Sequence, residues 1–300
     1  MNPEVYGEWC RRQGLCVIKT ESTHWYSEGF GVYQAFPFDR QIKPDEKELT
    51  ELFSRHKVAA LRFSSSLESG IGSVGYHVVY ERDTYDLQDL SVWARKNVRR
   101  GLKSCIVERI PFERFLLDGW SIRRDTLDRQ GREAEKSGAA WLRKYSSAAD
   151  LPGFEVWGAL VKGELGAFLL TFRMSDCVYM IHQQCKRSFM REHVNNALAF
   201  VVTQAAVANP EVRSVCYGIQ SLDAAASVDE FKFRMGYVQK KIRQRVLIHP
   251  LLAPAVNRVT QEFVKGLHRL MPRNRIVSKA EGLFRLSLAD ADGDPANVSA

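Results

Sequence analysis

Three apolar runs with a period of two, joined by two short turns, fill residues 154–185 of this 300-residue chain. Successive side chains of a strand point to opposite faces, so these runs predict strands, and Lys162-Gly163 and Ser175-Asp176 are typical turn sequences between them. Consecutive strands joined by tight turns pair antiparallel. The stretch therefore predicts a three-stranded antiparallel meander.

The elements after the meander alternate between helix and strand. The spacing of apolar residues predicts a helix over 190–208, a strand over 212–220, a short helix over 229–236 and a final strand over 237–250. This order is typical of an α+β fold with a mixed, largely antiparallel sheet and flanking helices, and not of a doubly wound parallel sheet.

The first half shows a looser version of this order, with strands expected over 16–19, 29–36, 58–65, 74–82 and 105–110 and helices over 43–56, 86–103 and 111–132. We therefore expect an internal duplication of one fold. Small and turn-forming residues over 146–153 mark a seam. The predicted division is an N-terminal domain at 1–145, a second domain at 150–250, a C-terminal helix at 251–286 and a disordered tail at 287–300.

Composition and motifs exclude several classes of protein. No apolar run approaches the roughly 20 residues needed to span a bilayer, so we expect a cytoplasmic protein. No serine-hydrolase elbow, phosphate loop or paired zinc histidines occur, and we expect no metal. Gly70, Gly72 and Gly75 match the letters of a dinucleotide fingerprint, but a strand pattern follows them, which favours a hairpin loop.

A basic stretch, ARKNVRRGLK, covers residues 94–103 in a chain whose net charge is +8. On a helix, Arg95, Arg99 and Lys103 lie along one edge with Lys96 and Arg100 beside them. The apolar stripe of this helix is expected to comprise Leu87, Leu90, Ala94, Val98 and Leu102. The cations form either a phosphate-binding face or a merely solvated surface.

A second informative stretch, CYGIQSLDAAASVDEFKFRMGY, covers residues 216–237. A strand ends near Ile219, and Lys232 follows between the apolar residues Phe231 and Met235. A lysine in such surroundings can clamp a carboxylate, a phosphate or a developing oxyanion. Its aliphatic stem can equally lie on apolar surface while the ammonium stays in water.

The order of elements, the sequence DEFKFRMGY after the penultimate strand and the basic helix in the first half resemble the FemAB-like branch of the GNAT acyltransferase superfamily. The resemblance covers most of residues 10–250. It implies tandem GNAT-like domains that transfer an acyl or aminoacyl group to an amine, without a covalent nucleophile.

The resemblance also implies roles for individual residues. Lys232 matches the motif lysine of the Fem branch, so it is expected to bind substrate and stabilise charge, and His193 and Asp229 are catalytic candidates by position. Substrate contacts are expected from Tyr217, Lys186 and Arg187 and from the helix cations Arg95, Lys96, Arg99 and Arg100.

The donor and acceptor stay open at this point. A GNAT domain that uses acyl-CoA usually holds the pyrophosphate on a glycine-rich loop before a helix, whereas residues 186–193, KRSFMREH, contain no glycine. Aminoacyl-tRNA is therefore the other candidate donor. The resemblance implies a small-molecule, nucleotide-linked or lipid-linked acceptor, and a role in the cell envelope or in polysaccharide biosynthesis.

A rival interpretation is a non-catalytic protein that binds nucleic acid or an anionic membrane through its basic helices. No motif for reading bases occurs, and we expect no stable binding of DNA. Residues 251–275 can form a basic amphipathic helix, which either lies at the inner face of a membrane or packs on the second domain.

Overall fold

The computed structural model describes residues 2–129, 137–220, 226–271 and 274–292. Helices and strands follow one another in the order α1 (Pro3–Arg12), β1 (Val17–Lys19), β2 (His24–Gly29), β3 (Val32–Phe36), α2 (Glu46–Arg55), β4 (Ala60–Ser65), β5 (Ser73–Tyr80), α3 (Val92–Ser104), β6 (Ile106–Arg109), α4 (Phe112–Arg129), α5 (Gly138–Ser146), β7 (Phe154–Val161), β8 (Glu164–Met174), β9 (Cys177–Cys185), α6 (Val194–Val207), β10 (Ser214–Ile219), α7 (Ala226–Arg234), β11 (Val238–Ile248), α8 (Arg258–Leu270) and α9 (Arg275–Asp292).

The chain forms two compact units, each assembled from separate stretches. Unit 1 comprises Met1–Val5, Val78–Gly218 and Ala225–Gln239, and unit 2 comprises the remaining stretches. The division thus falls within β5 and β11, and not at the seam that the sequence suggested at residues 146–153. That seam lies inside unit 1, between α5 and β7.

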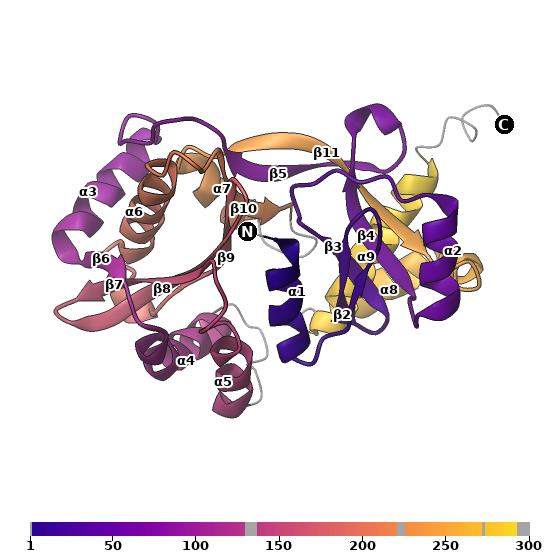
Figure 1. Ribbon diagram of the computed structural model, residues 1–300, viewed down its shortest axis with the longest axis horizontal. Coiled ribbons are helices and arrows are strands. Elements are labelled where there is room, and N and C mark those ends of the chain that lie inside the picture. Colours follow the sequence, from indigo (N-terminus) through magenta and orange to yellow (C-terminus); the bar gives the residue numbers. More distant parts are fainter. Residues whose placement is uncertain (1, 130–136, 221–225, 272–273, 293–300) are drawn as a thin grey trace. The chain divides into compact units, whose positions relative to one another are not determined.

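Unit 1 is built on a sheet with the strand order β5-β10-β9-β8-β7-β6. The meander β7-β8-β9 is antiparallel throughout, which confirms that prediction. Lys162 and Gly163, both at positive φ, make the first turn. Helices α3 and α6 lie together on one side of the meander and α4 and α5 on the other, as Figure 1 shows. The mixture of helices and a mixed sheet confirms the α+β class.

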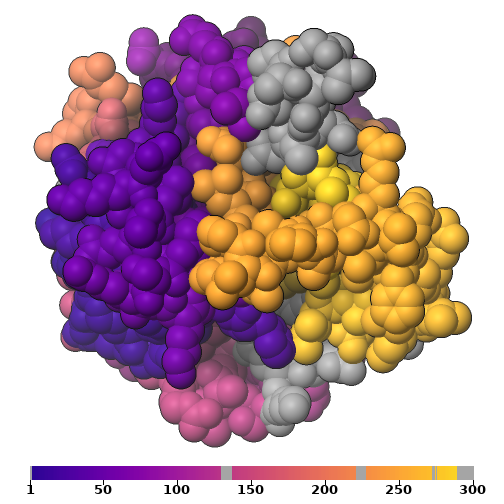
Figure 2. Space-filling model, turned by 90° about the vertical axis from the view of Figure 1, so that its right-hand side faces the viewer, coloured from indigo at the N-terminus to yellow at the C-terminus, as the bar shows by residue number. Residues whose placement is uncertain are grey.

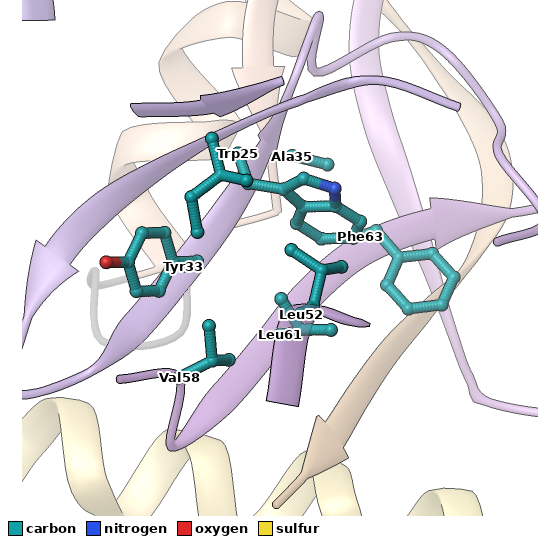
Figure 3. Close-up of a cluster of buried hydrophobic side chains, with 8 residues drawn as sticks. Trp25, Tyr33, Ala35, Leu52, Val58, Leu61 and Phe63 are labelled. Carbon is teal, nitrogen blue, oxygen red and sulfur yellow. The ribbon is translucent and has the colours of Figure 1, made fainter. Parts of the chain in front are cut away.

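Unit 2 has the strand order β1-β2-β3-β4-β11-β5, and one face of this sheet forms its core. A tryptophan, Trp25, lies edge-on to Phe63 at 5.8 Å between ring centres. Leu52 of α2 lies among the side chains of this cluster, next to Leu61 (Figure 3). The cluster comprises Ile18, Trp25, Tyr33, Ala35, Leu52, Val58, Leu61 and Phe63. Burial of these side chains is what holds α2 on the strands.

The helix predicted over 86–103 begins later than expected. Ser91 caps α3 by accepting a hydrogen bond from the backbone N–H of Ala94, and carboxylates of Asp86 and Asp89 organise the preceding turn. Leu87 and Leu90 therefore precede the helix. Leu102 is exposed, so the buried stripe consists of Ala94, Asn97, Val98 and Gly101.

Three other expectations about local structure were wrong. Residues 70–75 do not form a hairpin loop, because β11 lies between β4 and β5 in the sheet. The C-terminal region forms two helices, α8 and α9, that pack on each other, in place of one. Helix α9 also takes in residues 287–292 of the predicted tail, while 293–300 lie outside the described residues.

Helices α1 and α5 and strand β2 were not predicted from the sequence.

Across the part of the chain that the structure describes, no helix combines the length and the apolar character needed to cross a bilayer.

Candidate active site

Strands β9 and β10 of unit 1 separate partway along their length. They pair in parallel over three residues each, with Ser214–Cys216 opposite Cys177–Tyr179. Strand β9 then carries a bulge at its neighbour β8, where the register shifts between Met180 and His182. Tyr217 of β10 lies beyond the three paired residues and is not paired with a residue of β9. Side chains can therefore fill the opening between the two strands.

Hydrogen bonds between side chains bridge this opening. The Tyr217 hydroxyl donates to Oε1 of Gln183, and Nε2 of Gln183 donates to the carbonyl of Asn195 at 2.9 Å. Asn195 lies in the first turn of α6, so the chain of bonds joins β10, β9 and α6. Burial raises the pKa of Tyr217 above its ordinary value, which keeps the phenol protonated as a donor at neutral pH.

Lys232 and Asp229 lie beside this tyrosine on α7. The Lys232 ammonium contacts Oδ1 of Asp229 at 2.7 Å and lies 5.4 Å from the centre of the Tyr217 ring. Lys232 is only 8% exposed. The ion pair and the cation–π contact hold the ammonium at the opening between the strands.

Core packing fixes the backbone of Lys232. Met235 and Tyr237 are buried, and the Tyr237 hydroxyl is 2.6 Å from that of Thr203 on α6. Gly236 adopts φ +88°, and a Cβ there would lie 2.9 Å from the carbonyl oxygen of Asp89, so a glycine must end α7. The motif lysine thus projects from a rigid segment.

The cluster of Lys232, Tyr217 and Asp229 can stabilise negative charge. One ammonium N–H is directed to Asp229, and since no other acceptor among the residues described bonds Lys232, two N–H groups remain for an anionic group of a ligand. Asp229 accepts from Lys232, so it positions the ammonium. Such prearranged donors are what a developing oxyanion requires.

His193 belongs to a different part of unit 1. It precedes α6 with a left-handed backbone, φ 53°, and its carbonyl packs on Gly101 of α3. Burial and the nearby Arg100 lower the pKa of His193, so the imidazole is neutral near pH 7. No hydrogen bond or ion pair joins His193 to Lys232 within the described ranges.

The cations of α3 fall into two groups. Nε of Arg95 donates to the carbonyl of Leu87 at 2.8 Å, and its Nη2 donates to the carbonyls of Gln88 and Leu90 in the same loop. Lys96, Arg99 and Arg100 are exposed, and among the residues described they form no ion pair. With Val92 and Lys103 the four cations line an open depression of about 440 Å³ on one helix. Arg95 therefore organises the loop, and the other cations remain available to an anion.

Lys186 and Arg187 lie apart from both groups. Lys186 Nζ contacts Glu164 of β8 at 2.8 Å, and the backbone N–H of Arg187 donates to Asp125 of α4 at 2.7 Å. The candidates from the sequence are thus divided among three places in unit 1. Sequence reasoning missed the roles of Gln183, Asn195 and Thr203, although the pair of glutamines at the end of the third meander strand was a visible signal.

Four backbone N–H groups of the loop before α6 already have acceptors. The backbone N–H groups of Phe189, Met190 and His193 donate to carbonyls of the loop itself, at 3.2 Å each. The carboxylate of Asp125 already occupies the amide of Arg187. A phosphate cradle needs such amides free and favours no carboxylate beside them. Among the residues described, no cluster of side chains is placed to hold a metal ion either.

No family model and no curated protein matches this chain. Solved structures do resemble it: FemX superposes with a TM-score of 0.59 at 11% identity, covering 83% of this chain and 92% of that one. The C-terminal domain of a putative lysylphosphatidylglycerol synthetase from Agrobacterium fabrum gives 0.54 at 11% identity, covering 82% and 88%. L-PGS from Bacillus licheniformis gives 0.51 at 12% identity, covering 81% and 87%. The chain therefore shares the fold of FemX and of these synthetase structures, as the resemblance to FemAB-like proteins implied.

Proposed function

We propose that this protein is an N-acyltransferase that moves an acyl or aminoacyl group from an activated ester or thioester to an amine. The observation that carries the proposal is the nearly buried Lys232 ammonium, held by Asp229 and Tyr217 where β9 and β10 separate. The fold shared with FemX and the lysylphosphatidylglycerol synthetases supports a transferase.

In the proposed reaction the amine attacks the carbonyl carbon, forming the new C–N bond and a tetrahedral oxyanion. The Lys232 ammonium donates to that oxyanion, and the Tyr217 hydroxyl adds a neutral donor nearby. The intermediate collapses by breaking the bond to the donor's oxygen or sulfur, which takes up a proton as it leaves. Asp229 orients Lys232 throughout.

The amine has to lose a proton for the reaction to finish. His193 is neutral near pH 7, because burial and Arg100 lower its pKa, so it is able to accept that proton. We assign it this role as a proposal. The role requires that the amine of the acceptor approaches the start of α6.

The available cations of α3 are proposed to hold phosphate groups. Lys96, Arg99 and Arg100 face solvent, and Arg100 lies near His193, whose backbone packs on the same helix at Gly101. A donor or acceptor that carries phosphates would be attracted to this face. Lys186 contributes little under this proposal, because its ammonium pairs with Glu164 of β8.

The loop before α6 favours a donor other than acyl-CoA, and an aminoacyl ester such as aminoacyl-tRNA suits the exposed cations of α3 better. A lipid-linked or nucleotide-linked amine is the proposed acceptor. We further propose that the reaction belongs to the cell envelope and takes place in the cytoplasm; a role in polysaccharide biosynthesis has no observation in its favour.

The test pairs a mixture of radiolabelled aminoacyl-tRNAs, and separately acyl-CoAs, with candidate amine acceptors. Transfer is followed by mass spectrometry of the acceptor. We expect acceptor-dependent transfer from the tRNA mixture, with Lys232→Met lower than wild type by a factor of about 10² to 10³. Equal transfer by the wild type and the Lys232→Met variant would refute the proposed role of Lys232.

A second candidate function is binding of a polyanion without catalysis, favoured by the cations of α3 that form no ion pair with any residue described. The same mixtures distinguish the two functions. RNA binding that is weakened by Arg99→Met, with no transfer to any amine, would support this alternative.

A further inference from the structure

The outer face of α8, in unit 2, carries large apolar side chains in contact with solvent. Val259 is 80% exposed, Phe263 72% and Leu270 82%, and Leu251 in the preceding turn is 85% exposed. These are four of the seven large apolar residues in the described chain that are more than 70% exposed. Isolated exposed apolar residues are ordinary, but a run of them on one short helix indicates a binding surface.

The three helical residues form one stripe. Spacings of four and seven residues place Val259, Phe263 and Leu270 on one side of α8, while the opposite side packs against α9. An Asn257 capping box fixes the start of the helix by bonding the N–H of Thr260. The stripe is therefore presented by a defined helix, and Figure 2 shows this part of the chain, orange to yellow, at the surface.

Cations border the stripe on one side. Arg258, Lys265 and Arg269 project next to it, and Glu262 is the one carboxylate of the helix. Glu262 and Lys265 pair at 3.0 Å. An apolar stripe beside a basic border is the pattern of a helix that lies in the interface of an anionic membrane.

The centre of the stripe tells a lipid surface from a protein groove. Gly266 lies between Phe263 and Leu270, and a Cβ there would meet no atom within 4 Å. A helix that docks in a protein groove, or against a second copy of the chain, needs an apolar anchor side chain at residue 266, seven residues after Val259. Acyl chains close around a gap of this kind, whereas a rigid partner leaves it empty.

We propose that α8, together with Leu251, docks on an anionic phospholipid surface with its axis parallel to the membrane. Thirteen residues of helix span only about 20 Å, too short to cross a bilayer. The apolar stripe enters the boundary between headgroups and acyl chains, and Arg258 and Arg269 lie at the level of the phosphates. This surface is independent of the proposed acyl transfer, which occurs in unit 1.

Vesicle sedimentation of the full chain tests the proposal, with phosphatidylcholine vesicles that contain or lack phosphatidylglycerol and no substrate present. We expect binding to the anionic vesicles, weakened by salt, and about tenfold or greater loss in Phe263→Glu/Leu270→Glu. Leu117→Glu is the matched control, since Leu117 is equally exposed, at 79%, on α4 of unit 1; it should bind as wild type does.

A second readout guards against a misfolded variant. Phe263→Trp should show a blue-shifted fluorescence change on addition of anionic vesicles that Leu117→Trp does not show. The proposal is overturned if the wild type does not bind vesicles, or if the Phe263→Glu/Leu270→Glu variant binds them equally well. It is also overturned if the wild type forms a dimer in sedimentation velocity, the variant does not, and neither protein binds vesicles. None of these results depends on catalysis, so they leave the proposed transfer to its own test.

Discussion

At the residue scale, the ion pair of Lys232 with Asp229 changes what a substitution does. Lys232→Met should lower turnover by a factor of about 10² to 10³ and should also destabilise the protein by about 3 kcal/mol, because Asp229 would keep a nearly buried charge without its lysine. Kinetics and denaturant titrations measure the two effects. Lys232→Met/Asp229→Asn should recover most of the stability and none of the turnover.

Arg234, half-buried on the same helix, is the control for that experiment. It pairs with the exposed Glu230 and lies over the Trp93 ring, so Arg234→Met should change stability by about 1 kcal/mol or less. If Lys232→Met is as active as Arg234→Met, Lys232 has no part in the reaction.

His193 offers a test that separates backbone from side chain. Its φ of 53° suits asparagine and glycine, so His193→Asn and His193→Gly should fold as stably as the wild type while lacking the imidazole. If His193 is the base, turnover falls in both variants, and the wild type keeps its activity at pH values below 6.5 because burial and Arg100 lower the pKa. Unchanged pH–rate profiles in the two variants would assign the base elsewhere.

His77, buried in unit 2, should make stability depend on pH. Its Nε2 lies 2.8 Å from the Ser64 hydroxyl, and burial, followed by Lys240 and Arg62, lowers its pKa from 6.5 to about 4. The unfolded chain therefore binds a proton first as the pH falls. The contribution of His77 to the free energy of unfolding is fully present above pH 6.5, and it decreases by about 3 kcal/mol as the pH falls to about 4.

His77→Gln removes this titration and keeps a polar group near Ser64. Between neutral pH and pH 4, denaturant titrations should therefore show a smaller loss of unfolding free energy in His77→Gln than in the wild type. Equal losses in the two proteins would mean that other groups govern the acid sensitivity.

At the scale of elements, α3 combines a structural arginine with ligand-facing cations. Arg95→Met should lower the melting temperature, because the carbonyls of Leu87 and Leu90 lose a charged donor worth about 1.5 kcal/mol or more. Arg99→Met should leave the melting temperature unchanged and weaken binding of a phosphorylated ligand or RNA. Thermal melts and binding titrations of the two variants separate these roles, and a melting temperature that falls equally in both would contradict the division.

At the scale of the whole molecule, the two units determine which fragments fold. The predicted domain at 150–250 lacks β6, which pairs with β7, and it lacks α3 and α4, which pack on α6 and on β8 and β9. A fragment of residues 150–250 should therefore show no cooperative unfolding in circular dichroism, whereas residues 78–239 should unfold cooperatively. Cooperative unfolding of the shorter fragment would restore the division proposed from the sequence.

The sequence by itself determined the kinds of elements and their order in the second half of the chain. Apolar periodicity and turn residues such as Lys162-Gly163 act between neighbours in sequence, so the meander, the helix after it and the segment that carries Lys232 could be predicted from local rules. The α+β class and the resemblance to FemAB-like proteins followed from that order.

Tertiary structure alone decided the pairings between distant residues. It placed β11 between β4 and β5, assigned β6, α3 and α4 to the same unit as the meander, and gave Arg95 to a loop while leaving Arg99 to solvent. It also joined Tyr217 to Gln183 and set Lys232 beside them. These contacts depend on long-range packing and strand register, which the periodicity of a single segment does not encode.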